Sequence, residues 1–382
     1  MQAFLLFTLL IGTLAAPTTT SQQPNASASV AAFQKTYENN VVSQFTSACN
    51  TSNIRVRKSW SALTTSERLQ YLHAVSCLSK KPSLTDPSLC PGCRNRRDDF
   101  TYSHINQTNY IHQSGLFLPW HREFIQQYEN ALHEECGLKI GLPYWDWAEH
   151  SDNQTKSPVF DGSPTSFGSN GAYIPPSSRA PYTTDSILNI TVNGSAFSLA
   201  RDPGTGGGCV TDGFFHNLTL NIGPVTPSNN APDNVWGTKY NPRCMTRDID
   251  NTLSAQQLNY TVVSNVLSQP DIHSFHTLLE NTMHPSSHSS IGGALFDFYS
   301  SPNDPAFFLL HSMHDRVWTV WQGQDFAART NGVDGTVTVF NSPPSENATL
   351  STMMKFVAVS PDVAIGTVMK TVGAPGYCYM YQ

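Results

Sequence analysis

The sequence is poor in charged residues, and its overall charge is slightly acidic. Charged side chains make up 13% of the 382 residues, and 22 Lys and Arg against 28 Asp and Glu give a net charge of −6. A chain with so little positive charge does not have the composition that binding to nucleic acid or to an anionic membrane favours. We therefore expect no nucleic acid and no membrane among its partners.

Long hydrophobic runs are missing beyond the first residues. The chain starts with MQAFLLFTLLIGTLAAP, a short apolar segment that ends in small residues, as a secretory signal peptide does. No later stretch reaches the roughly 18 apolar residues of a membrane-spanning helix. We predict that residues 1–16 are a signal peptide, cleaved near Ala15 or Ala16, and that the mature protein is secreted and extracellular.

Free cysteine is the third feature that we expect to be missing. Eight cysteines are scattered along the chain, together with nine Asn-x-Ser/Thr sequons. An even number of dispersed cysteines in an exported protein is typical of disulfide bonds, whose pairing the sequence leaves open. Cys90 and Cys93 form the motif CPGC, but no second pair completes a zinc ribbon, so we interpret both as disulfide half-cystines. We predict a disulfide-bonded glycoprotein.

Regular secondary structure is predicted to be helical, with long irregular connections. Five segments have the apolar spacing of helices, and they lie at 33–45, 65–78, 119–137, 254–283 and from Pro305 onward. A polar segment at 17–32 is expected to be loose, and the stretch at 150–250, rich in Pro, Gly, Asn and Ser, favours loops. We expect residues 33–382 to form a single, mainly α domain with long loops and a few short β-strands.

Thirteen histidines are present, and several lie on the apolar faces of predicted helices. His121 and His311 each share a helix face with aromatic residues. His284 and His288 are four residues apart, a spacing that places two imidazoles on one side of a helix turn. Nitrogen-only ligation suits copper, zinc or nickel. From these residues alone, a metal site and buried histidines with ordinary hydrogen bonds are equally good interpretations.

Two motifs built on these histidines resemble the copper motifs of the tyrosinase and catechol oxidase (polyphenol oxidase) family, whose members contain a type 3 dinuclear copper centre. The first is His112-x4-Phe-Leu-Pro-Trp-His121-Arg, with Asp98-Asp99-Phe100-x3-His104 before it and Pro-Tyr-Trp-Asp-Trp at 143–147 after it. The second is His284-x3-His288, followed by Asp304-Pro305-x-Phe-x3-His311-x3-Asp315-Arg316. The resemblance spans residues 33 to 382 in matching order and ends with Tyr377-x-Tyr379.

The resemblance implies a central four-helix bundle that holds two copper ions. By resemblance, the ligands of one copper are His104, His112 and His121, and those of the other are His284, His288 and His311. The family's activity implies that O2 and small phenolic substrates are the partners. An o-diphenol (catechol) gives up two electrons to become an o-quinone, and O2 is reduced to water. Asp315 is expected either to orient a ligand histidine or to form an ion pair with Arg316 or another basic residue.

One position favours oxidation of diphenols over hydroxylation of monophenols. Residue 285 is Pro, whereas family members that hydroxylate monophenols well often carry Asn there, which helps a nearby Glu to orient a water. Glu280 is our candidate for that catalytic Glu. Phe298 matches an aromatic gate over the first copper, although the role of a core Phe fits it equally well. We therefore expect a catechol oxidase with weak or no monophenol hydroxylation.

Other interpretations stay open at this point. The chain could be a tyrosinase with full monophenolase activity, an oxidase of o-aminophenols or bulkier phenols, a haemocyanin-like O2 carrier or a structural zinc protein. Tyr110 stands where some members carry a Cys joined to the second histidine, so no thioether is expected. The chain ends three residues after Tyr379, similar to short secreted members without a C-terminal shielding domain. Structural roles are expected for other histidines, among them His73 and His314, whereas His273 and His276 are expected on a helix surface or as supports of the ligand histidines.

Overall fold

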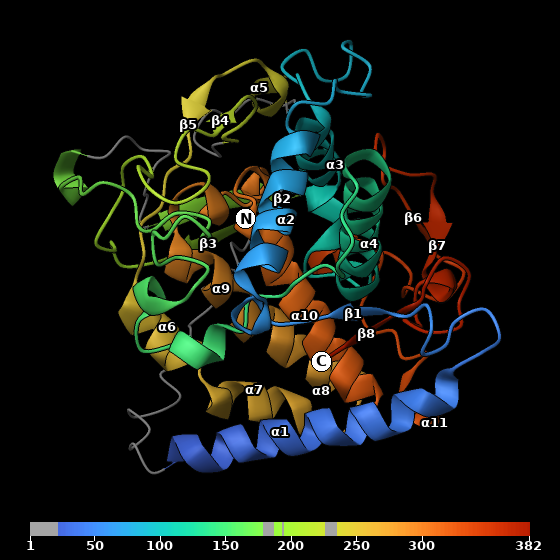
Figure 1. Cartoon of the computed structure of the whole chain (residues 1–382). Helices are drawn as coiled ribbons and strands as arrows, with labels where there is room; N and C mark the ends of the chain where they lie inside the picture. Colours follow the sequence, from blue (N-terminus) through green and yellow to red (C-terminus); the bar gives the residue numbers. More distant parts are fainter. Residues whose placement is uncertain (1–21, 179–186, 193–194, 226–234) are drawn as a thin grey trace, which may run out of the picture.

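The computed structural model describes residues 22–178, 187–192, 195–225 and 235–382 (Figure 1). The predicted signal peptide lies outside the described residues. In the described part, the fold is mainly helical, and its strands form four two-stranded sheets. None of the described helices combines the length and the apolar character that crossing a membrane requires. The prediction of a mainly α fold with few short strands is confirmed.

Helices make up the centre of the molecule. The longer α-helices are α1 (Gln22–Val41), α2 (Thr65–Leu78), α3 (Arg96–Ile111), α4 (Phe117–Cys136) and α10 (Ala306–Gln322). The shorter ones are α5 (Val235–Thr238), α6 (Asn251–Gln257), α7 (Tyr260–Leu267), α8 (Ile272–Leu278), α9 (His284–Ile291) and α11 (Phe326–Arg329). A π-helical turn, Leu279–Met283, joins α8 directly to α9. The strands are β1 (Arg55–Arg57), β2 (Ile187–Val192), β3 (Ser195–Ala200), β4 (Thr219–Leu220), β5 (Arg243–Cys244), β6 (Met353–Met354), β7 (Val363–Ala364) and β8 (Tyr379–Tyr381).

Local sequence signals explain where the central helices begin and end. Thr64 caps α2 within a capping box, and Asn95 does the same for α3. α4 ends before Gly137, which adopts the left-handed conformation with a φ of 71°, as the residue after a helix commonly does. The predicted segments lack α3, although Asn95 followed by Asp98 three residues later is a signal for its start.

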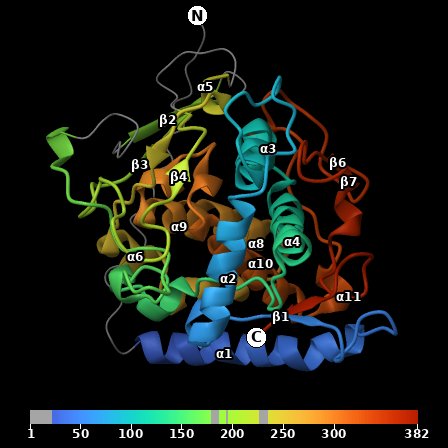
Figure 2. The ribbon, with the colours of Figure 1, turned by 45° about the horizontal axis from the view of Figure 1, so that its top comes forward.

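The expectation that residues 17–32 are loose is wrong from Gln22 onward. α1 begins there and is 20 residues long. Val30, Tyr37 and Val41 are buried, and α1 contacts α7 and α10. The helix runs along one edge of the molecule (Figure 2). The predicted segment at 33–45 covers the second half of α1, but polar composition concealed the first half, because the stability of the helix comes from packing one face against the rest of the fold.

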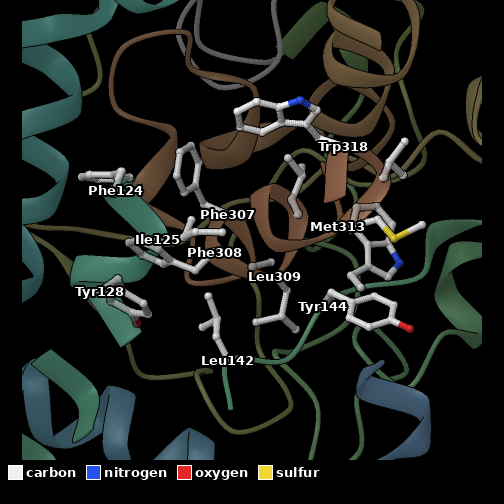
Figure 3. Close-up of a cluster of buried hydrophobic side chains, with 14 of the residues drawn as sticks. Phe124, Ile125, Tyr128, Leu142, Tyr144, Phe307, Phe308, Leu309, Met313 and Trp318 are labelled. Carbon is white, nitrogen blue, oxygen red and sulfur yellow. The ribbon is translucent and has the colours of Figure 1, made fainter. Parts of the chain in front are cut away.

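Aromatic side chains fill the space between α4 and α10 (Figure 3). The rings of Phe124 and Tyr128 from α4 stack on Phe308 from α10, with centroids 5.8 and 3.4 Å away. All three side chains are at most 1% exposed. Interiors packed at this density tolerate little displacement, so the aromatic layer sets the spacing of the two helices.

A buried ionic network connects the last strand of the chain to α4 and α10. Arg122 Nε lies 2.6 Å from one oxygen of Asp315, and Arg57 Nη1 lies 3.3 Å from the other. Tyr379 and Tyr381 of β8 donate hydroxyl hydrogen bonds to Asp315 at 2.6 and 2.7 Å. Burial alone would raise the pKa of Asp315, but Arg122 and Arg57 hold this pKa below its ordinary value. The carboxylate is therefore charged and has several partners.

We predict that Asp315→Ala lowers the free energy of unfolding by about 3–5 kcal/mol, because Arg122 would stay buried after losing its carboxylate partner. Urea unfolding followed by circular dichroism measures the difference from the unmodified protein. Asp362→Ala removes an exposed carboxylate and serves as the control, with an expected change below about 0.5 kcal/mol. A loss below about 1 kcal/mol for Asp315→Ala would contradict this role of the network.

Candidate metal centre

Six of the thirteen histidines converge at the centre of the fold. They come from α3 and its C-cap, from α4, from α9 and from α10. They form two triads: His104, His112 and His121, and His284, His288 and His311. Within each triad the candidate ligand atoms all lie within 4.8 Å of one another. The structure thus brings together the six histidines that the sequence motifs single out.

Main-chain carbonyl groups set the orientation of four of these rings. Their Nδ1 atoms each lie 2.7–3.0 Å from a main-chain oxygen: His104 from that of Tyr299, His112 from that of Thr108, His121 from that of Phe117 and His288 from that of Leu295. A carbonyl oxygen only accepts hydrogen bonds, so Nδ1 carries the proton and Nε2 keeps its lone pair. The buried Nε2 atoms of His104, His121 and His284 have no hydrogen-bond partner among the described residues. Unpaired Nε2 atoms at the centre of each triad fit metal ligation.

Burial keeps these imidazoles neutral. Desolvation is the main effect, and it lowers the pKa of His112 to about 3 and that of His288 to about 4. The same effect, reinforced by neighbouring histidines, lowers the pKa of the other four well below the ordinary value. Neutral imidazole is the form that binds a metal ion, so the pocket maintains the required protonation state near neutral pH.

The two triads share one space. The rings of His121 and His311 stack with centroids 4.2 Å apart, and those of His112 and His284 stack at 5.6 Å. Each stacked pair contains one ring from each triad. Phe307 lies 5.2 and 4.2 Å from the rings of His104 and His311, so a single aromatic side chain supports both triads.

A pocket opens onto the triads beside His112, His284 and His288. Its volume is about 680 Å³, a figure that includes the space in its open mouth. Its other lining residues come from four places in the chain: Gln113; Glu280, Asn281, Pro285 and Ser289; Phe296, Asp297, Phe298 and Ser301; and Phe340. Both candidate catalytic residues, Glu280 and Phe298, therefore lie where a substrate would enter.

Glu280 is held by two hydrogen bonds. One carboxylate oxygen accepts the main-chain N–H of Gln113 at 2.5 Å, and the other lies 2.8 Å from Nε2 of His276. Burial lowers the pKa of His276, but the bond to Glu280 outweighs this effect and raises the pKa above its ordinary value. His276 therefore supports a lining residue of the pocket, and this contact with Glu280 was not predicted from the sequence. Its only signal was the four-residue spacing from Glu280.

Phe298 contacts the first triad. Its ring centroid lies 4.8 Å from that of His112, and its side chain forms one wall of the pocket. It also packs against a small buried cluster that includes Ile222 and Tyr299. The position is thus compatible with both expected roles, and the role of Phe298 as a gate stays a prediction.

Asp315 forms the ion pair expected of it, but with basic residues other than Arg316. It neither contacts a histidine of the triads nor pairs with Arg316 among the hydrogen bonds and ion pairs of the described residues. Its partners are Arg57, Arg122 and the tyrosines of β8. One of these partners, Arg122, directly follows His121 in α4.

His314 lies close to the centre without joining it. Its ring is buried, with centroids 5.3 Å from those of His284 and His311, yet it belongs to neither triad. Its imidazole also packs against Trp147 at 4.9 Å. His273, by contrast, is exposed and bonds with the carboxylate of Asp334.

All eight cysteines form disulfide bonds. The pairs are Cys49–Cys378, Cys77–Cys136, Cys90–Cys93 and Cys209–Cys244. None of the eight is free, which confirms the prediction. No cysteine is therefore available to form a thioether with a histidine of the first triad.

A comparison with protein families identifies the arrangement. The family model for tyrosinase, described as the common central domain of tyrosinase, matches residues 94–324, more than half of the chain. All six histidines of the triads lie within the matched range. The chain belongs to the tyrosinase family.

Individual relatives agree with this assignment. Tyrosinase-like protein orsC of Emericella nidulans is 40% identical over 305 residues, which cover 77% of this chain and 81% of that protein. N-acetyl-6-hydroxytryptophan oxidase ivoB of the same organism is 37% identical over 359 residues, covering 87% and 94%. The structure of a polyphenol oxidase variant from Thermothelomyces thermophila superimposes with a TM-score of 0.79 at 35% identity, covering 95% of this chain and 97% of that one. The protein is a phenol oxidase of the tyrosinase family, and its triads are consistent with the family's dinuclear type 3 copper centre.

We predict that His311→Ala reduces the copper content from about two ions to about one per chain, because the second triad would lose one of its three nitrogen ligands. Elemental analysis of the purified protein measures the content. His314→Ala is the matched control: it removes a buried imidazole next to the same ring and should leave both ions in place. Equal copper loss in the two variants would contradict the assignment of His311.

Proposed function

We propose that this tyrosinase-family protein oxidises o-diphenols to o-quinones, with weak or no hydroxylation of monophenols. One copper would be held by His104, His112 and His121, and the other by His284, His288 and His311. Bound copper supplies the redox chemistry between the phenol and O2. In balance, two diphenols lose four electrons and four protons, and one O2 becomes two waters. The observation that carries the proposal is that two neutral histidine triads open onto one aromatic-lined pocket.

The pocket suits a flat aromatic substrate. Phe296, Phe298 and Phe340 supply apolar walls, and the imidazoles of His112, His284 and His288 form the inner end. A phenol ring in this space buries apolar surface and packs against aromatic neighbours in offset or edge-on contacts. Its hydroxyl groups then point towards the triads. The protein's share of the reaction is to position the ring and to keep the Nδ1–H groups of the ligand histidines hydrogen-bonded to main-chain carbonyl oxygens.

Pro285 supports the preference for diphenols. It lines the pocket directly after His284, and proline provides no hydrogen-bond donor there. A monophenol has to lose its hydroxyl proton before it is hydroxylated, and in this proposal a water held by Glu280 accepts that proton. Without an amide at position 285, this water has one partner fewer. A catechol is more acidic and already carries both oxygens, so it depends less on such a base.

We expect the copper-loaded protein to consume O2 rapidly with 4-tert-butylcatechol and at least about ten times more slowly with 4-tert-butylphenol. Pro285→Asn should raise the phenol-to-catechol rate ratio about tenfold, the effect of one added hydrogen bond. Pro361→Asn, at an exposed proline, is the control and should leave the ratio unchanged. Comparable rates on both substrates would make the protein a tyrosinase with full monophenolase activity. If the protein consumed O2 with neither substrate, O2 binding without turnover would be favoured.

We also propose that the protein is secreted. Its four disulfides are of the kind that forms in an oxidising compartment. The sequon residues Asn106, Asn217 and Asn347 are exposed and accessible to glycosylation. Asn259 is 3% exposed and its amide donates to main-chain oxygens, which argues against glycosylation at that sequon.

Secretion predicts the first residue of the mature chain. Protein recovered from the culture medium should begin directly after Ala15 or Ala16, and treatment with an N-glycosidase should reduce its mass. N-terminal sequencing and mass spectrometry measure both. Retention inside the cell with Met1 in place would contradict the proposal.

A further inference from the structure

We infer that the pocket recognises phenols whose ring substituent carries an amide group, through the side chains of Gln113 and Asn281. The inference rests on the proposed function, because it names the substrate class of the same site. Both residues line the pocket beside the triads. Gln113 directly follows His112 of the first triad, and Asn281 lies three residues before His284 of the second. The amide pair therefore joins the two sides of the centre.

Gln113 is held firmly in place by three hydrogen bonds. Its main-chain N–H donates to Glu280 at 2.5 Å, its Nε2 donates to Oδ1 of Asn281 at 3.0 Å, and its carbonyl oxygen accepts the N–H of Phe340 at 3.0 Å. Its φ of +50° lies in the left-handed region, which a residue with a side chain adopts at an energetic cost. Strain of this kind persists where the surroundings overdetermine it and is common at ligand-binding sites.

The bond between the two carboxamides uses one hydrogen of Gln113 Nε2 and one lone pair of Asn281 Oδ1, so polar groups stay available on both side chains. Gln113 keeps Oε1 as an acceptor, and Asn281 keeps the hydrogens of Nδ2 as donors. Neither group has another hydrogen-bond partner among the described residues. If the oxygen and nitrogen atoms of both amides are interchanged, one side chain still presents an available acceptor oxygen and the other an available donor nitrogen. A secondary amide satisfies both groups, because its N–H donates and its C=O accepts.

Charge in the pocket disfavours the alternatives. Its titratable lining groups besides the histidines are Glu280 and Asp297, and no Lys or Arg is among the lining residues that the structure describes. A carboxylate substituent would meet two acidic side chains without a cation to balance it. An ammonium substituent finds both carboxylates engaged, since Glu280 bonds to His276 and Gln113, and Asp297 accepts three main-chain N–H groups. A neutral amide avoids the desolvation of an unpaired charge.

The position of the amide pair suits a substituent rather than the phenol ring. Asn281 lies in the π-helical turn, four residues before Pro285 of α9, and both residues line the pocket. In this inference, a ring packed on Phe298 has its hydroxyls towards the triads and its substituent at Gln113 and Asn281, which line the same pocket. The two amides then contact the substituent of the bound ring.

The test compares kcat/KM for N-acetyldopamine and 4-ethylcatechol, measured as O2 uptake by the copper-loaded protein. We expect N-acetyldopamine to be preferred. Asn281→Leu should lower the ratio of the two values about tenfold, the effect of one lost hydrogen bond, mainly through KM. Gln113→Met removes the other amide and should act in the same direction. Asn265→Leu, at an exposed Asn of α7 that does not line the pocket, should leave the ratio within about twofold.

Two charged catechols extend the test. Dopamine and 3,4-dihydroxyphenylacetate should both have a lower kcat/KM than N-acetyldopamine, because neither satisfies the donor and the acceptor together. Copper content and circular dichroism of each variant confirm that it is folded. If Asn281→Leu is not, Gln113→Met carries the test.

The outcomes separate the two proposals. Rapid uptake with 4-ethylcatechol and an unchanged ratio in the folded amide variants would overturn the amide inference and leave the proposed function in place. An equal fall of the ratio in Asn265→Leu would overturn it as well. No uptake with either catechol by the unmodified protein would overturn the proposed function itself.

Discussion

The buried contact between Arg122 and Asp315 is the constraint on which the metal centre depends. Arg122 directly follows His121 in α4, and Asp315 lies one turn after His311 in α10, with 2.6 Å between Nε and Oδ1. The contact therefore sets where the last histidine of each triad stands relative to the other. A buried ion pair contributes little net stability compared with an apolar pair of similar shape, so its main contribution here is geometric specificity.

The loop after α9 connects the geometry of the metal centre with the shape of the pocket. Its main-chain oxygens at Leu295 and Tyr299 orient His288 of one triad and His104 of the other. The same loop places the side chain of Phe298 in the wall of the pocket. Because one segment has both tasks, substitutions that reshape the pocket in this loop also affect the orientation of the imidazoles. Substrate preference and metal geometry are therefore not independent in this protein.

The parts of the structure that depend on local pattern could be predicted from the sequence, and the parts that depend on distant contacts could not. The six histidines and the helices α2 and α4 have signals within one or two turns of the chain. His276 is different, because its burial and orientation depend on the main-chain oxygen of Asp334, 58 residues later. Asp315 was recognised as a motif residue, but its partners Arg57 and Tyr381 lie 258 residues before it and 66 after it. The first half of α1 was missed for the same reason, since residues 22–32 are held in a helix that packs against α7 and α10.

The π-helical turn at 279–283 links the conformation of the backbone there to the ability of His284 and His288 to hold a metal ion. A π turn contains about one residue more than an α turn, and each residue of an α-helix rotates the chain by about 100°. If this segment relaxed into a regular α-helix of unchanged length, α9 would turn by roughly that angle, and His284 and His288 would point away from the centre. The backbone form that is more stable in isolation is thus incompatible with the second triad. By thermodynamic linkage, a metal ion that holds these two histidines also holds the helix in its rarer form.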